Sequence, residues 1–103
     1  MTYDKDSTPT PLNYLGDTTL AWARSVGWGE HSTLEDLALL ASEVGECINE
    51  CRGPAPSDAF ATELADVILR ALGIARKHDI DVDATVLAVM RRNAERGNRG
   101  RTK

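Results

Sequence analysis

The sequence predicts an all-α protein, and two observations support this fold class. Of the 103 residues, 42% are hydrophobic and 27% are charged, a balance typical of folded globular domains. Only 5% are aromatic, whereas alanine and leucine are abundant, which favours helices because strands prefer aromatic and β-branched side chains. The length suits one domain over residues 1–103, with flexible ends at 1–9 and 97–103. We expect an antiparallel bundle of about four helices.

The first helix is expected to begin at "TPTP" and to end at Gly27. Thr10 suits the N-cap, and Pro11 suits the first helical position, where the missing N–H of proline has no partner to lose. Glycine is a common residue just beyond the end of a helix. The side of this helix that is expected to face the core comprises Leu12, Leu15, Thr19, Trp22 and Val26.

The second helix is expected to run from "STLE" to Arg52, where "GPAP" ends it. Ser32 and Glu35 have the spacing of a capping box, in which each side chain accepts a hydrogen bond from the other residue's backbone N–H. Apolar residues recur at three- and four-residue intervals, as on the inward face of a helix: Leu37, Leu40, Val44 and Ile48.

Two further helices follow after short links. Ser57 can cap the third, which is the most apolar segment and ends near "KHDID". The fourth begins at Asp81 or Asp83, since acidic residues suit a helix N-terminus, and runs toward Gly97. The apolar positions of these two helices are Phe60, Leu64, Val67, Ile68, Leu72 and Ala75, then Val86, Val89 and Met90. The short links favour antiparallel neighbours.

Composition also limits the setting of the protein. No apolar run approaches the length of about 20 residues that a membrane span requires, and the polar start "MTYDKDSTPTP" differs from a signal peptide. We therefore expect a cytoplasmic protein with no membrane partner. Cys47 and Cys51 lie four residues apart with no further cysteine to build a disulfide framework or a zinc site, so we expect free thiols.

Basic side chains are concentrated at the C-terminal end. Residues 91–103 hold six of the 12 Lys and Arg residues, whereas the rest of the chain is acidic and the net charge is −4. Such a tail can bind nucleic acid by neutralising phosphates, or it can be a solvated end. We favour the solvated end and expect no nucleic-acid partner, because no aromatic residue interleaves the charges to stack on bases.

Two pairs of carboxylates lie on consecutive helices. Glu43 and Glu46 are three residues apart in "ASEVGECINE", as are Glu63 and Asp66 in "ATELADVILR", so each pair shares a helix face. The sixteen residues between the pairs allow a turn between antiparallel helices, which would bring the pairs together. Four clustered carboxylates repel one another unless a cation holds them. The spacing therefore predicts a metal site.

Oxygen ligands indicate a hard cation. Mg²⁺ binds a few carboxylates and completes its shell with water and substrate phosphates, and Mn²⁺ can substitute. A di-iron centre is disfavoured, because neither His31 nor His78 follows a glutamate at the Glu-x-x-His offset. Either pair alone is better explained as a solvated helix face. Two pairs beside apolar positions favour a site.

The combination of Glu-x-x-Glu, sixteen residues and Glu-x-x-Asp resembles the signature of the all-α, MazG-like nucleoside triphosphate pyrophosphohydrolases. "LASEVGEC" is similar to the first metal helix of that family, "ELADVILRAL" to the second, and "DIDVDATVLAVMRRNAER" to the helix that follows. The resemblance covers residues 12–96. It implies Mg²⁺-dependent hydrolysis of an NTP or dNTP to the monophosphate and pyrophosphate, in clearing unwanted nucleotides, by a homodimer or homotetramer.

The resemblance also implies roles for individual residues. It makes Glu43, Glu46, Glu63 and Asp66 the metal ligands, adds Glu50 to Glu43 and Glu46 as catalytic carboxylates, and places Arg92, Asn93 and Arg96 at the substrate phosphates. Glu50 either orients the attacking water or only extends the acidic stripe. Val89 stands where many relatives have a lysine four residues before the asparagine, and Arg91 or Arg92 can compensate.

The nucleoside contacts are expected just before the first metal helix. Trp28 and His31, in "GWGEHS", are candidates because an aromatic ring can stack on a base, although His31 can equally be a surface loop residue. The sequence does not select a base. It has no Gly-x-x-x-x-Gly-Lys-Ser/Thr loop, which excludes a P-loop ATPase. A non-catalytic helical module that binds nucleotide or protein remains the alternative, because Val89 replaces the lysine.

Overall fold

The computed structural model describes residues 11–97, which form four helices. These are α1 (Leu12–Ser25), α2 (Thr33–Asn49), α3 (Phe60–Lys77) and α4 (Val82–Arg96). No strand occurs within residues 11–97, so the predicted all-α class is confirmed for this part of the chain. Thr10, the expected flexible segment 1–9 and all of the expected C-terminal segment except Gly97 lie outside the described residues.

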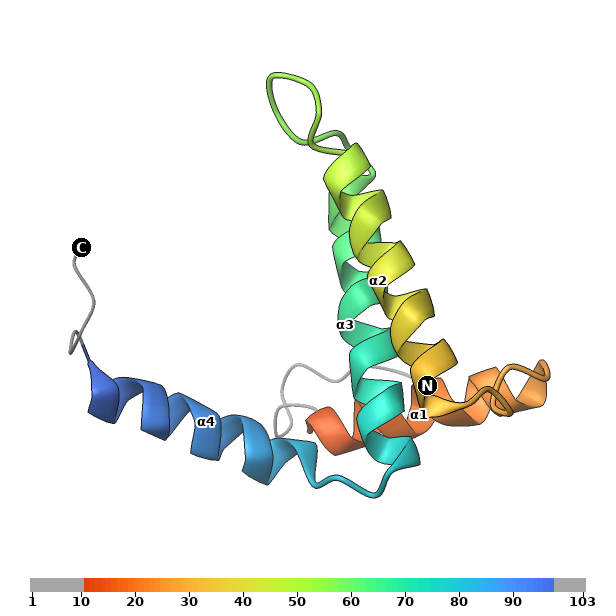
Figure 1. Ribbon diagram of the computed structural model, residues 1–103, viewed down its shortest axis with the longest axis vertical. Helices are drawn as coiled ribbons and strands as arrows, with labels where there is room; N and C mark the ends of the chain where they lie inside the picture. Colours follow the sequence, from red (N-terminus) through yellow and green to blue (C-terminus); the bar gives the residue numbers. More distant parts are fainter. Residues whose placement is uncertain (1–10, 98–103) are drawn as a thin grey trace, which may run out of the picture.

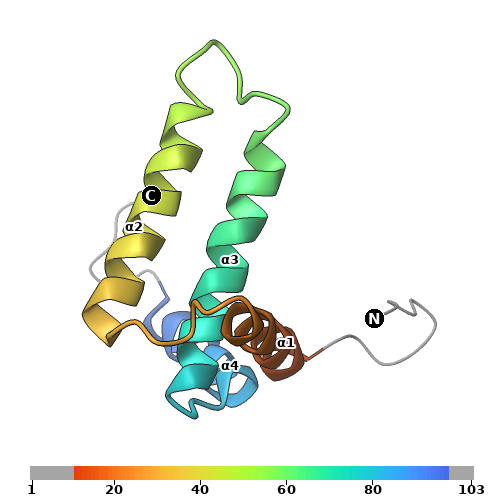
Figure 2. The same cartoon turned by 90° about the vertical axis from the view of Figure 1, so that its right-hand side faces the viewer.

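The helices α2 and α3 form an antiparallel hairpin, and the other two helices are attached to its base (Figure 1). Helix α1 crosses α3 near the end of α3, as Figure 2 shows by viewing α1 along its axis. Helix α4 contacts α1 and α3 and then extends away from the hairpin (Figure 1). The expected antiparallel packing of neighbours therefore holds for α2 and α3, whereas α4 does not lie along the hairpin.

Side-chain caps from neighbouring residues mark the start of two of the four described helices. Ser32 and Glu35 form the predicted capping box, and the carboxylate of Asp81 accepts a hydrogen bond from the Ala84 N–H at the start of α4. The prediction of Ser57 as the cap of α3 was wrong, because α3 begins two residues later, after Ala59. The Ser57 hydroxyl oxygen instead accepts a hydrogen bond from the Ala59 N–H within the loop between α2 and α3.

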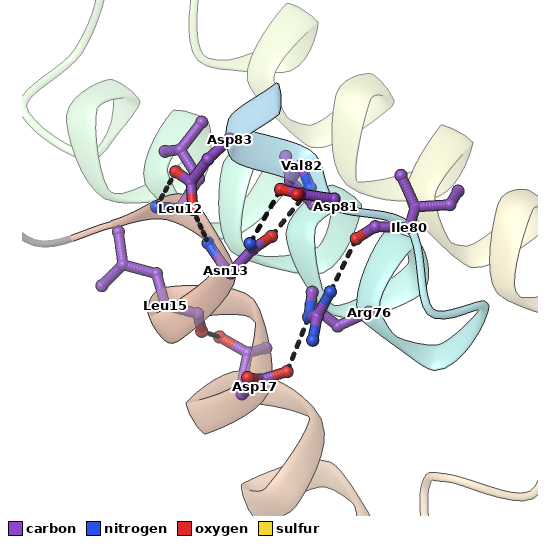
Figure 3. A network of polar contacts seen from close by, with 10 residues as sticks. Leu12, Asn13, Leu15, Asp17, Arg76, Ile80, Asp81, Val82 and Asp83 are labelled. Carbon is purple, nitrogen blue, oxygen red and sulfur yellow. Dashed lines mark hydrogen bonds and ion pairs between the residues drawn. The ribbon is translucent and has the colours of Figure 1, made fainter. Parts of the chain in front are cut away.

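The N-termini of α1 and α4 cap each other (Figure 3). The Asp83 carboxylate accepts hydrogen bonds from the backbone N–H groups of Leu12, at 2.7 Å, and Asn13, at 3.2 Å. In return, the Asn13 side-chain oxygen accepts a hydrogen bond from the Val82 N–H at 2.7 Å. Backbone N–H groups in the first turn of a helix have no partner inside the helix, so this exchange satisfies both ends at once.

Small residues allow α1 to approach α3 closely. A Cβ atom on Gly16 would lie 2.6 Å from Arg76 Cγ and 2.7 Å from the Leu72 carbonyl oxygen, so only glycine fits. The buried residues Gly16, Leu72, Gly73 and Val82 all lie in this junction of α1, α3 and α4. Arg76 Nε donates to Asp17 Oδ1 at 2.8 Å across the same contact (Figure 3). The junction is therefore the best-packed part of the described chain.

The inward faces of α2 and α3 differ from the predicted apolar stripes. The least exposed residues of α2 are Asp36, Leu40, Glu43 and Cys47, and its C-cap Glu50 is half-buried as well, whereas the predicted Leu37, Val44 and Ile48 are exposed. On α3, Leu64 and Ile68 are exposed, while Glu63 and Arg70 are less so. The expected stripe was thus wrong for these five apolar residues within one chain. The reason is that charged side chains pair across the seam of the hairpin.

The tryptophans also lie outside any core. Trp22 was expected on the inward side of α1, but 54% of it is exposed, and Val26 is exposed as well. The Trp22 ring instead meets the edge or face of Trp28, with ring centroids 5.0 Å apart and planes nearly perpendicular. This contact attaches the loop after α1 to the outer surface of that helix. Cys47 is buried and Cys51 exposed, and both are free thiols as predicted.

Candidate metal centre and adjoining pocket

Charged residues face one another in a ladder along the seam between α2 and α3. Lys77 Nζ lies 2.8 Å from Asp36 Oδ2, and Arg70 Nε lies 3.1 Å from Glu43 Oε1. Each step along the ladder is seven residues on α2 and seven residues in the opposite direction on α3, a spacing that returns to nearly the same helix face. The next step in this register brings Glu50 opposite Glu63. The first two positions match opposite charges, whereas the third places two acids together.

The unmatched end of the ladder contains a compact carboxylate cluster, which we define as Glu43, Glu63 and Asp66. One carboxylate oxygen from each residue lies within 4.8 Å of the others. Loss of water contact, and then the negative charges of Glu46 and Asp66, raise the pKa of the Glu63 carboxyl above its ordinary value. The cluster therefore holds more negative charge than its protein partners neutralise, with Arg70 as its one ion-pair partner among the described residues.

The fourth predicted ligand, Glu46, lies next to this cluster but outside it. It is exposed, and it lines a polar hollow together with Ser42, Asn49, Glu50 and Arg52. Its negative charge contributes to the raised pKa of Glu63, and on α2 it lies one helical turn after Glu43. Glu50 accepts a hydrogen bond from the Ser57 hydroxyl, so its carboxylate helps to hold the loop between α2 and α3. Three of the four predicted ligands thus meet directly.

The donor set fits a hard divalent cation. All three members of the cluster offer carboxylate oxygen, which Mg²⁺ and Mn²⁺ accept, and two of them are half-buried while Asp66 is exposed to solvent. Such a cation takes a few protein ligands and keeps positions for water or phosphate oxygens. The histidines that a di-iron site would need lie elsewhere: His78 contacts Thr33 at 3.0 Å, and His31 lies in the loop before α2.

A pocket of about 340 Å³ is lined by Arg70, the ion-pair partner of Glu43, although no residue of the cluster itself lines it. Its apolar wall comes from α1 and α3 through Leu20, Ala23 and Ile74, and Trp28 forms another side. The predicted nucleoside contacts Trp28 and His31 both line it, as do the ladder residues Asp36, Arg70 and Lys77. The volume and the mixture of apolar walls with a few polar groups are typical of small-molecule sites.

Arg70 connects the cluster to the pocket, and the sequence prediction missed it. Its guanidinium pairs with Glu43 and lines the pocket, and its Cζ atom lies 6.0 Å from the centre of the Trp28 ring. The available signal was its position seven residues after Glu63 and four after Asp66 on the same helix. The sequence prediction also missed Lys77. Its Nζ atom donates to the His31 carbonyl oxygen at 2.6 Å and to Asp36, and these bonds hold the loop that contains Trp28.

The predicted phosphate-binding residues are not near the cluster within one chain. Arg92, Asn93 and Arg96 are exposed on the second half of α4, which extends away from the hairpin (Figure 1). Within residues 11–97, α4 contacts α1 and α3 but not α2. Val89 is exposed on the same helix. The fold therefore separates the basic end of α4 from the acidic seam that it was expected to complement.

Comparison with protein-family models, with curated proteins and with solved structures found no match to this chain. Within the described residues, none of the four helices is both long and apolar enough to cross a membrane.

Proposed function

We propose that the protein is a Mg²⁺-dependent nucleoside triphosphate pyrophosphohydrolase, acting in the cytoplasm on an NTP or dNTP. The observation that supports this best is the carboxylate cluster formed by two helices, together with a pocket that Trp28 lines and that Arg70, the ion-pair partner of Glu43, links to the cluster. The signature Glu-x-x-Glu, sixteen residues and Glu-x-x-Asp, which resembles that of the MazG-like enzymes, supports the same reaction.

The residues present divide into two sets with distinct tasks. Glu43, Glu63 and Asp66 would hold the cation, with Glu46 as a further carboxylate at its edge. When bound, the cation would neutralise phosphate oxygens and activate water for attack on phosphorus. Trp28 offers a ring face or edge to a base, and His31 and Arg70 line the same pocket as polar groups.

Product analysis tests the proposed reaction. The protein is incubated with each common NTP and dNTP in the presence of Mg²⁺, and the products are separated. The proposal predicts the monophosphate and pyrophosphate from at least one triphosphate, and no turnover after chelation of the metal. Formation of diphosphate and inorganic phosphate would show a different reaction, and no turnover of any of them would contradict the proposal.

The proposal includes a second copy of the chain. The outward stripe, which we define as Leu37, Val44 and Ile48 of α2 with Leu64 and Ile68 of α3, is exposed on the hairpin, and Val86, Val89 and Met90 are exposed on α4. A small domain that leaves so many large apolar side chains in water is expected to cover them by association. The basic end of α4 also complements the acidic hairpin in charge. A homodimer, alone or paired into a homotetramer, would place Arg92, Asn93 and Arg96 of one copy near the carboxylates of the other.

Light scattering tests the association. A dimer or tetramer at micromolar concentration is expected for the wild type, and Ile68→Glu or Met90→Glu should shift it toward the monomer, because each would bury a charge in the interface. A wild-type chain that stays monomeric at that concentration would contradict the association.

A non-catalytic helical module that binds nucleotide or protein is the second candidate function. One observation favours it: Val89 occupies the position of the expected lysine, and the other phosphate-binding candidates lie far along α4. Such a module predicts nucleotide binding or complex formation without turnover, so the same product analysis separates the two functions.

A further inference from the structure

Arg70 occupies a position that the proposed cation would contest. Its Nε atom lies 3.1 Å from Glu43 Oε1, and Glu43 is one of the three carboxylates whose oxygens converge. The side chain of Arg70 is 35% exposed and that of Glu43 is 21% exposed, so the pair lies at the rim of the seam with room for the guanidinium to move. On its other side Arg70 borders the pocket that Trp28 lines.

We propose that Arg70 is a movable counter-ion, which neutralises Glu43 before a divalent cation binds and turns toward the Trp28 pocket once the cation has bound. This role rests on the proposed function, which supplies the cation site. It deepens that function, because the position of Arg70 at the pocket would depend on whether the metal is bound. The anionic part of a pocket ligand, a phosphate of the triphosphate class, would then meet a guanidinium released from its carboxylate.

The charges of the ladder lead to this inference. At the Asp36 position, Lys77 is held by two acceptors, the Asp36 carboxylate and the His31 carbonyl oxygen, and so has a complete structural role. Among residues 11–97, Arg70 has one carboxylate partner, and that partner belongs to the cluster. A divalent cation and a guanidinium on the same carboxylate repel each other, and the cation also draws on Glu63 and Asp66. The guanidinium is therefore the group that gives way.

The released side chain has a favourable destination. Guanidinium groups are attracted to aromatic ring faces and bind phosphate oxygens with two parallel hydrogen bonds. At 6.0 Å from the Trp28 ring centre, the Arg70 guanidinium already lies at the limit of such a contact, so a small rotation brings it over the ring or into the pocket. Trp28 thus becomes a reporter for the state of the cluster.

The test uses Mg²⁺ alone as the probe and does not require turnover. Affinity for Mg²⁺ is measured by calorimetry for the full chain and for its Arg70→Gln and Arg70→Lys variants. Emission from Trp28 is followed in parallel in a Trp22→Phe background, which leaves one tryptophan and keeps an aromatic ring at position 22. Arg24→Gln serves as the matched control, because Arg24 is an exposed arginine on α1 and not on the helices that form the cluster.

Arg70→Gln is expected to bind Mg²⁺ about three- to fivefold more tightly, in line with the modest strength of an ion pair at this exposure, and to lose the Mg²⁺-dependent change in Trp28 emission. Arg70→Lys keeps the positive charge and should bind Mg²⁺ like the wild type, as should Arg24→Gln. Equal or weaker Mg²⁺ binding by Arg70→Gln, with the emission change retained, would overturn the role of Arg70 and leave the proposed function standing. If neither the wild type nor any variant binds Mg²⁺, both the role and the proposed cation site fail.

Discussion

The two ends of α3 differ in how they treat charge and packing. At its C-terminal end, α3 packs closely against α1 and α4, with Gly16, Leu72 and Val82 buried in the contact. Charged side chains there have partners of opposite sign, as Arg76 has in Asp17. At its N-terminal end, Glu63 and Asp66 face Glu43, Arg70 is the one ion-pair partner of these acids in the described part of the chain, and apolar side chains are exposed. One end of α3 is therefore closely packed with its charges paired, whereas the other end has excess negative charge and exposed apolar side chains.

This difference separates residues that build the fold from residues that await a ligand. Repulsion among carboxylates lowers the stability of the folded chain, so their convergence is best explained by a partner of opposite charge that arrives later. The exposed outward stripe indicates an apolar partner surface that covers these side chains. The junction at the other end satisfies its own groups and needs neither. Substitutions at the N-terminal end of α3 should therefore change metal binding and turnover, whereas substitutions at the C-terminal end should change the stability of the fold.

The largest expected effect concerns the cluster. Replacing Glu43 or Glu63 by glutamine, or Asp66 by asparagine, keeps the shape of the side chain but removes an anionic ligand. Turnover of the triphosphate should fall on the order of a hundredfold, the size found when one electrostatic contact to a transition state is lost. Steady-state kinetics at saturating Mg²⁺ measures this. Glu30→Gln, at an exposed carboxylate in the loop before α2, is the control and should retain full activity.

The next effect concerns the junction. Gly16→Ala would force a methyl group against the Leu72 carbonyl and the Arg76 side chain, and should lower the free energy of unfolding by about 1–3 kcal/mol. Gly45→Ala is the matched control within α2, where an added Cβ meets nothing within 4 Å, and should raise stability by about 0.5–1 kcal/mol. Urea unfolding measures both. Equal changes in the two variants would show that the junction is not closely packed in solution.

A smaller effect is expected from the reciprocal caps. Asp83→Ala leaves the Leu12 and Asn13 N–H groups without their acceptor and should cost about 1 kcal/mol, as for a lost helix cap. Asp58→Ala removes an exposed carboxylate from the loop between α2 and α3 and serves as the comparison. If urea unfolding gives the same stability for both variants, the link between α1 and α4 does not contribute.

The smallest effect depends on pH. The hydrogen bond from the Asn13 side chain, and then the bond from the Ala84 N–H, hold the pKa of the Asp81 carboxyl below its ordinary value of about 4. A lowered carboxyl pKa gives stability that is present above the unfolded pKa and is lost as the pH falls through the folded pKa. Asp81→Asn should therefore lose less stability than the wild type on acidification below about pH 4. Parallel unfolding curves for the two proteins across that range would contradict the assignment.

Local signals in the sequence predicted the elements well but not how they pack. The capping box of Ser32 and Glu35 and the cap at Asp81 are set by neighbours three residues away, so a short window of sequence contains them. The exchange between Asn13 and Asp83 joins residues 70 apart and has no local signature. The packing of α4 on α1 likewise joins residues far apart in the sequence.

The sequence predicted only part of the candidate site, because the spacing on one helix does not show how two helices pack. Spacing on each helix placed Glu43, Glu63 and Asp66 on faces that can meet, and the antiparallel hairpin brings them together. Periodicity could not show that the faces with charged residues, and not those with Val44 and Ile68, would turn inward, because an apolar stripe has the same pattern whether it packs on its own chain or on another. Arg70 escaped notice because its role depends on the partner helix.

The most direct test of the account is the effect of Mg²⁺ on thermal unfolding of the wild type and the three amide variants. At about a hundred times its dissociation constant, Mg²⁺ should stabilise the wild type by about 2.7 kcal/mol, a shift of several degrees in Tm for a domain of this size. Without metal, Glu63→Gln and Asp66→Asn should melt at the wild-type temperature or above it, because repulsion is relieved, whereas Glu43→Gln also loses the ion pair with Arg70. Each of the three variants should gain less from Mg²⁺. Variants that melt lower without metal and keep the full Mg²⁺ shift, as Glu30→Gln is expected to keep it, would show that these carboxylates are only a solvated face.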